Sequence, residues 1–155
     1  MRLHRFHGGL RLDGHKAESA AGGLRPCPPP DRLRVSLLQH AGPPAGPCVA
    51  VGDRVRRGQR LGEALDARAV AVHSPVAGVV EALVEEDLPQ WPGQRATHVV
   101  LATSPGGDAV RLPVLDWTRS PPDALRARIA EAGISGLGGA GFPTADKLAA
   151  GRDLL

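Results

Sequence analysis

The residues with the clearest chemical potential form a glycine-rich run at positions 134–144, Ile-Ser-Gly-Leu-Gly-Gly-Ala-Gly-Phe-Pro-Thr. Four glycines in six positions let main-chain N–H groups turn inward and approach an oxygen-rich ligand closely. Thr144 is expected to cap a new helix, whose N-terminus favours a phosphate, and Lys147 follows about one turn into that helix. The spacing predicts an anion site. It leaves open the alternative that the run is a flexible turn between two helices.

Gly136, Gly138 and Gly141 also satisfy the pattern G-x-G-x-x-G. A dinucleotide-binding fingerprint of this kind follows a strand and is trailed by an acidic residue about 20 positions later. Here the preceding element is a predicted helix, and the chain ends too soon to test the acid. The pattern therefore does not by itself predict an ordinary dinucleotide-binding fold.

Two helices are expected to hold the glycine run. The first covers residues 120–132, with Ser120 as the cap, Pro121 in the first turn and Gly133 at the end. The second covers residues 144–154 and is interrupted by Gly151. The run would then connect two consecutive helices.

The region before these helices is expected to be built of strands. Short apolar runs alternate with glycine turns, as short strands joined by tight turns should. We expect strands within residues 33–38, 48–62, 70–83 and 97–102. Residues 85–95 are acidic and contain two prolines, and they are predicted to form a loop.

Composition excludes several classes of protein. The formal net charge is +3, and no basic run is interleaved with aromatic residues, so nucleic-acid binding is not expected. The two cysteines, Cys27 and Cys48, form no C-x-x-C motif, so no metal or iron–sulfur ligand set is predicted in this chain. No apolar run reaches about 18 residues, so direct membrane insertion is not expected.

The glycine turns of the strand region carry a first resemblance. Val-Gly-Asp-x-Val-x-x-Gly-Gln-x-Leu-Gly at 51–62, followed by Ser-Pro-x-x-Gly-x-Val at 74–80, resembles the barrel-sandwich hybrid of biotinyl and lipoyl carriers. Carriers present a modifiable lysine at a hairpin tip, which would fall at 65–69, and that stretch contains none. We therefore expect a structural or docking module. His73 is interpreted as a surface or turn histidine, since no partner cluster is evident.

A longer resemblance rests on the glycine run itself. Gly-Leu-Gly-Gly-Ala-Gly-Phe-Pro-Thr, followed by Lys147 and Leu148, closely resembles the flavin and NADH loop of RnfC (RsxC)-like proteins. The same loop occurs in the flavin-bearing NADH-oxidising subunit of complex I and in related cobalamin reductases. The Phe-His-Gly-Gly-Leu run at 6–10, ahead of a carrier-like domain, favours the RnfC family.

The resemblance implies a binding site but no catalytic residue and no metal ligand in this chain. The implied cofactors are FMN and NADH. The residues that match the family's cofactor-binding loop are Gly136, Gly138, Gly139, Ala140, Gly141, Phe142, Pro143, Thr144 and Lys147. In the family, [4Fe-4S] clusters belong to a C-terminal part that this sequence does not contain.

The implied fold is mainly β with α at the C-terminus. A barrel-sandwich hybrid domain would be followed by the truncated start of an α/β flavin/NADH-binding domain. The expected divisions are an irregular segment at 1–31, the hybrid domain at 32–102, a linker at 103–120 and the helix–loop–helix at 121–155. Without the parallel strands of a complete domain, the isolated chain is expected to bind flavin weakly or not at all, and its last dozen residues to be poorly packed.

The implied function is electron transport within a membrane ion-translocating ferredoxin:NAD oxidoreductase. The intact family exchanges electrons with NAD(H) through FMN, whereas this 155-residue chain alone is expected to be inactive. Expected partners are NAD(H) and the other subunits of the complex, with a cytoplasmic location, peripheral on the inner membrane. The alternative is a non-enzymatic carrier-like β module that acts as a docking or scaffold domain.

Overall fold

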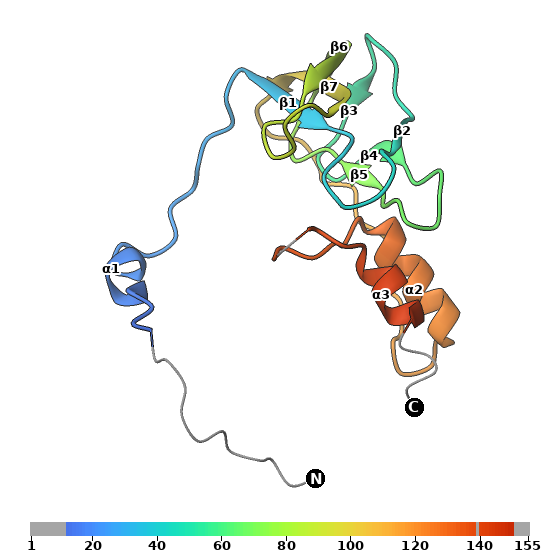
Figure 1. The fold of residues 1–155 in the computed structure, drawn as a ribbon. Coiled ribbons are helices and arrows are strands. Elements are labelled where there is room, and N and C mark those ends of the chain that lie inside the picture. Colours follow the sequence, from blue (N-terminus) through green and yellow to red (C-terminus); the bar gives the residue numbers. More distant parts are fainter. Residues whose placement is uncertain (1–11, 139, 151–155) are drawn as a thin grey trace, which may run out of the picture.

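The computed structural model describes residues 12–138 and 140–150, so the Phe-His-Gly-Gly-Leu run at 6–10 lies outside the described residues. Figure 1 shows a β domain with a helical segment beneath it and an extended N-terminal arm. The strands are β1 (Arg32–Ser36), β2 (Gly46–Pro47), β3 (Arg54–Val55), β4 (Arg60–Glu63), β5 (Val72–His73), β6 (Ala77–Asp87) and β7 (Arg95–Ser104). The helices are α1 (Lys16–Ala20), α2 (Pro122–Glu131) and α3 (Thr144–Ala150).

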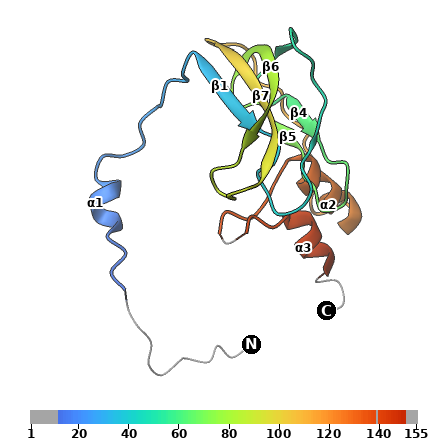
Figure 2. The same ribbon diagram turned by 45° about the horizontal axis from the view of Figure 1, so that its top comes forward.

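The strands form two antiparallel sheets. One has the order β1-β7-β6-β3 and the other the order β2-β4-β5. In the first sheet Arg32 pairs with Ala102 and Ser36 with His98, so the first strand of the chain pairs with the last. Figure 2 shows β1, β7 and β6 side by side. This arrangement confirms the mainly β fold expected from the sequence.

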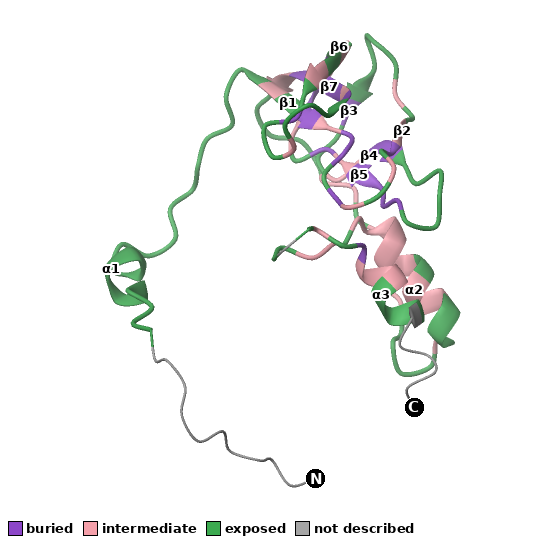
Figure 3. Cartoon of the chain, viewed as in Figure 1, coloured by how far each residue is buried: buried purple, intermediate pink, exposed green. Residues whose placement is uncertain are grey.

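The hydrophobic core lies between the two sheets and contains no aromatic residue. Alternating side chains of the strands point inward, as a half-buried sheet requires. The buried cluster consists of Val35, Leu37, Ala45, Val55, Leu61, Val72, Val80, Val99 and Leu101. In Figure 3 the buried residues concentrate in the β domain, while α2 contains none. Most of the buried residues therefore belong to the β domain.

The loop predicted at 85–95 is wrong at both ends. β6 continues to Asp87 and β7 begins at Arg95, which leaves only 88–94 as a turn. Cross-strand partners explain the difference, since Thr97 donates a hydrogen bond to Glu85 and Arg95 lies 3.4 Å from Asp87. Such pairs stabilise a sheet against the poor strand propensity of acidic residues.

Ser120 does not cap α2, contrary to the sequence prediction. The helix starts at Pro122, and Pro121 occupies the capping position with an extended ψ of 151°. A residue that precedes a proline is pushed out of the helical region, so Pro121 itself cannot be helical. The predicted helix end is confirmed, because Gly133 follows the helix with a φ of +71°.

The segments on either side of the β domain have little regular structure. Residues 12–31 are all exposed, with α1 as their one described helix. Residues 105–120 contain no helix or strand, although Val110 donates a hydrogen bond to the Arg57 carbonyl at 2.8 Å. The described side chains of α3 are half-buried or exposed, and none of them is fully buried. The domain boundaries inferred from the sequence stay predictions.

Candidate functional site

The glycine run forms a narrow hairpin between α2 and α3. Ser135 and Pro143 form an antiparallel bridge. Gly136 N–H donates to the Phe142 carbonyl at 2.9 Å, and Thr144 N–H donates to the Ile134 carbonyl at 3.1 Å. Residues 135–143 are termed the glycine hairpin below. Two amides expected to face a ligand are thus already used by the protein's own carbonyls.

The tip of the glycine hairpin keeps other amides available. Within residues 12–138 and 140–150, no hydrogen bond uses the amide of Leu137, Gly138 or Ala140. All three residues are exposed, and nothing lies within 4 Å of the place where a side chain on Gly138 would begin. The amides that lack a partner among the described residues therefore lie at the tip, and the anion site itself stays a prediction.

Thr144 does not cap α3, contrary to the sequence prediction. α3 begins at Thr144, and Lys147 N–H donates to the Pro143 carbonyl at 3.2 Å, so Thr144 lies inside the helix and does not cap it. Pro143 is fully buried and anchors the hairpin. Lys147 is exposed on α3, one turn from the hairpin.

The β domain holds the helical segment at two points. On one side Ala71 N–H donates to the Ala130 carbonyl at 3.4 Å, and on the other Ala41 N–H donates to the Gly141 carbonyl at 3.0 Å. Gly133 lies so close to the first contact that an added Cβ would stand 2.3 Å from the Ala71 carbonyl oxygen. The β domain is thus tied to α2 and to the second half of the glycine hairpin.

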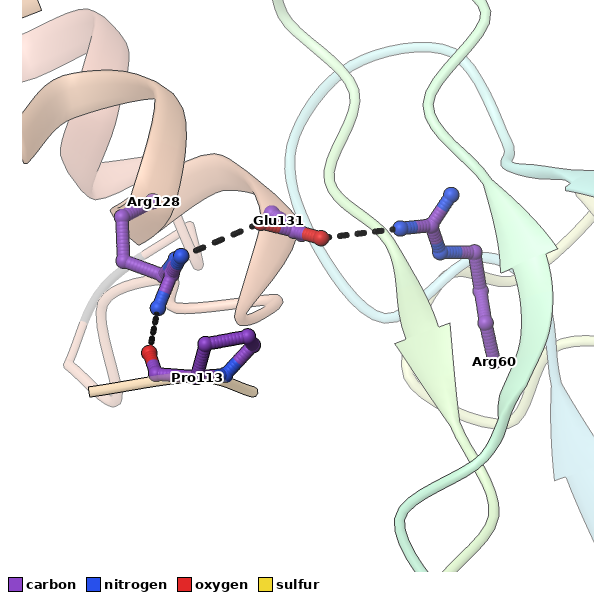
Figure 4. A network of polar contacts seen from close by, with 4 residues as sticks. All are labelled: Arg60, Pro113, Arg128 and Glu131. Carbon is purple, nitrogen blue, oxygen red and sulfur yellow. Dashed lines mark hydrogen bonds and ion pairs between the residues drawn. The ribbon is translucent and has the colours of Figure 1, made fainter. Parts of the chain in front are cut away.

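Charged groups reinforce this junction, as Figure 4 shows. Arg60 of β4 lies 3.3 Å from Glu131 of α2, and Glu131 lies 3.3 Å from the Nε atom of Arg128. Arg128 also donates a hydrogen bond to the Pro113 carbonyl. Glu131 therefore links β4 to α2, and Arg128 links α2 to the segment before it.

A cavity of about 610 Å³ lies between the glycine hairpin and the β domain. Of the predicted site residues it brings together Gly136, Ala140 and Gly141. Gly138, Phe142, Pro143, Thr144 and Lys147 do not line it, and Gly139 lies outside the described residues. The β domain contributes Gln39, His73 and Trp91. The cofactor roles of the predicted residues stay predictions.

Comparison with known proteins identifies the family. A family profile described as the RnfC barrel sandwich hybrid domain matches residues 4–104. The chain belongs to the RnfC family. It is 42% identical over 149 residues to a protein of Pseudomonas aeruginosa that is named as the C subunit of an ion-translocating oxidoreductase complex. Proteins with the same name from Serratia proteamaculans and Pectobacterium carotovorum are 40% and 37% identical over 154 and 153 residues.

These matches cover almost all of this RnfC-family chain and a small part of each relative. The three alignments include 96%, 98% and 97% of the chain, but only 19%, 22% and 20% of the relatives. The chain thus spans about a fifth of the length of the curated relatives it matches. The activities of the whole relatives are therefore treated as proposals for this chain.

The described residues offer neither a metal centre nor a membrane-spanning helix. Among them, no group of three or more His, Cys, Asp or Glu side chains could hold a metal ion. Cys27 and Cys48 are free and exposed. None of the helices in the described part of the chain is both long and apolar enough to cross a membrane.

His73 is placed differently from the turn histidine expected from the sequence. It ends β5, lines the cavity and lies beside Gly133, where an added Cβ would be 3.4 Å from its Nδ1 atom. Burial lowers the pKa of the His73 imidazole, Arg60 lowers it further, and Glu131 opposes the shift. Sequence reasoning missed Gln39 and Trp91 altogether, since neither belongs to a motif.

A second histidine, His40, is buried in the loop whose Ala41 amide binds Gly141. Its Nε2 atom lies 3.0 Å from the Pro43 carbonyl oxygen and 3.3 Å from the Val70 amide nitrogen, while Nδ1 has no hydrogen-bond partner among the described residues. Burial lowers the pKa of the His40 imidazole, and the hydrogen bond to Pro43 partly offsets the shift. Burial without a partner for Nδ1 favours the neutral ring.

Acid is expected to destabilise the fold through these two histidines. A lowered pKa in the folded state means that the unfolded chain binds more protons just below the ordinary value of 6.5. The stability that the two neutral imidazoles contribute is therefore fully present above pH 6.5. It is lost as the pH falls towards the pKa values of the folded state. Urea unfolding at about pH 7.5 and about pH 5.5 should show a smaller loss in His40→Gln than in the unmodified chain. Equal losses would contradict a role for His40.

Proposed function

We propose that this chain forms part of an electron-transport subunit that exchanges electrons with NAD(H) through bound FMN. The glycine hairpin carries the proposal, because its tip presents main-chain amides that no described group satisfies, beside a cavity of about 610 Å³. The relatives are named as a component of an ion-translocating oxidoreductase complex, which supports a role in electron transport.

The described residues fit the phosphate of a flavin nucleotide. Leu137, Gly138 and Ala140 would donate their amides to phosphate oxygens, as glycine-rich concavities do for anions. Lys147, exposed one turn into α3, would add a positive charge at the helical end of the hairpin. When bound, FMN supplies the step between two-electron chemistry at NADH and one-electron transfer. The chain's own residues would bind and orient it.

Iron–sulfur clusters do not fit the residues present. The chain has two cysteines, both exposed, and none of its described residues forms a metal-binding group. The proposal therefore assigns [4Fe-4S] clusters to no residue of this chain. Its proposed partners are the other subunits of a membrane complex, with a peripheral position on the cytoplasmic face of the inner membrane.

A titration of the chain with FMN tests the proposal. We expect weak but saturable quenching of flavin fluorescence, because the cavity is open and the amides lie at an exposed tip. Gly138→Val should abolish it, because an added Cβ at Gly138 meets no protein atom within 4 Å and the larger side chain would crowd a phosphate bound at the neighbouring amides. Lys147→Ala should weaken it without abolishing it.

Gly22→Val is the matched control for this titration. Gly22 also has open space around it, with only Arg25 Nη2 within 4 Å, and it lies in the N-terminal arm. This variant should bind FMN as the unmodified chain does. A stably folded chain that shows no saturable quenching would overturn the proposal in favour of the docking module.

A further inference from the structure

Trp91 lies at the turn between β6 and β7 and is held there by hydrogen bonds and packing. Its amide donates to the Leu88 carbonyl at 3.1 Å, and its own carbonyl accepts from Gln94 N–H at 3.0 Å. The half-buried side chain packs against the small cluster of Leu38, Leu88 and Ala96. An indole fixed in this way is available as a preformed surface without further ordering.

The same indole lies beside the glycine hairpin. Trp91 lines the cavity of about 610 Å³ and also a neighbouring one of about 240 Å³. Ala140 of the hairpin lines both cavities too. The β domain therefore brings an aromatic side chain to the space next to the tip of the glycine hairpin.

Polar groups complete the cavity wall. Ser135 contributes a hydroxyl and His73 an imidazole, and both residues are half-buried. Both line the cavity, as does Gln39, whose amide nitrogen donates to the Ser36 carbonyl at 2.9 Å while its oxygen is unused. An aromatic surface with a few convergent polar groups is typical of a site for a planar heteroaromatic ligand.

We propose that the β domain supplies the ring subsite of the flavin site, with the isoalloxazine ring stacked on the indole of Trp91. This inference rests on the proposed function, in which the tip amides hold the phosphate. It makes Trp91 a binding residue and the barrel a working part of the site. Ser135, His73 and Gln39 would hydrogen-bond the polar edge of the ring.

Fluorescence of bound FMN tests the stacking. Contact with an indole quenches flavin emission, whereas anisotropy reports binding whether or not the ring touches a tryptophan. We expect Trp91→Phe to restore the emission of bound flavin and to weaken binding by about two- to tenfold. Trp117→Phe is the matched control, since Trp117 is 76% exposed and does not line the cavity. It should behave as the unmodified chain.

A second measurement needs no change at Trp91. The chain has two indole N–H groups, and Trp117→Phe identifies the signal of Trp91 in a proton–nitrogen NMR spectrum. FMN should shift that signal. The inference is overturned if FMN binds but neither the Trp91 signal nor the emission in Trp91→Phe changes. It is also overturned if NADH shifts the Trp91 signal and FMN does not. If the unmodified chain binds no FMN at all, the result contradicts the proposed function, whereas the outcomes above contradict the stacking alone.

Discussion

Gly133→Ala is expected to loosen the attachment of the glycine hairpin and to lower the free energy of unfolding by about 2–4 kcal/mol. Two independent features of Gly133 cause this. Its φ of +71° is unfavourable for any residue with a Cβ, and that Cβ would stand 2.3 Å from the Ala71 carbonyl oxygen. Backbone at the junction must therefore move apart. Urea unfolding measures the loss.

Gly106→Ala is the control that separates the cost of the close approach at Gly133 from the cost of its positive φ. Gly106 has a φ of +74°, nearly the same as Gly133, but nothing lies within 4 Å of its added Cβ. Its variant should lose only about 1–2 kcal/mol. Hydrogen exchange should show faster opening of the Ala41 and Ala71 amides, which bind the helical segment, in Gly133→Ala alone. Equal losses and equal exchange in the two variants would show that the junction is not tight.

Leu101→Ala is expected to destabilise the β domain by about 2–5 kcal/mol. Leu101 has no exposed surface and lies in β7, where it pairs with Leu33 of β1 and Val80 of β6. Alanine would leave a cavity at the centre of the larger sheet. Because a domain of this size is stable by only about 5–15 kcal/mol, the change should remove a large share of the total.

Leu83→Ala provides the comparison within the same sheet. Leu83 is 36% exposed on β6, so its truncation should cost well under half as much. Thermal unfolding followed by circular dichroism measures both variants. Similar midpoints for the two would mean that the cluster around Leu101 is not the core of the domain.

Much of the β domain could be predicted because its signals are local. Alternating apolar residues and glycine turns determine short strands, and the aromatic-poor composition requires a core of valine, leucine and alanine, as observed. Gly133 ends α2 as predicted for the same reason. Acidic strand ends such as Glu85 and Asp87 were missed, because their stabilisation comes from partners on β7 that lie ten or so positions away.

The site was only partly predictable. The glycine run was found from its composition, but the pairing of Gly136 with Phe142 and of Thr144 with Ile134 depends on how the chain folds back. That pairing removes two of the amides assigned to a ligand. Trp91 reaches the cavity from a turn about 45 positions before the hairpin, and no spacing rule connects the two. Tertiary contacts of this kind carry no sequence motif.

The pairing of β1 with β7 has a consequence for synthesis. Arg32 leaves the ribosome well before its partner Ala102, and the intervening strands cannot close the barrel without that last strand. At roughly 5–20 residues per second, the nascent chain waits several seconds with its first strand unpaired. Non-local pairing also slows folding itself. The barrel is therefore completed late, while the β6–β7 ribbon forms from neighbouring residues as soon as it emerges.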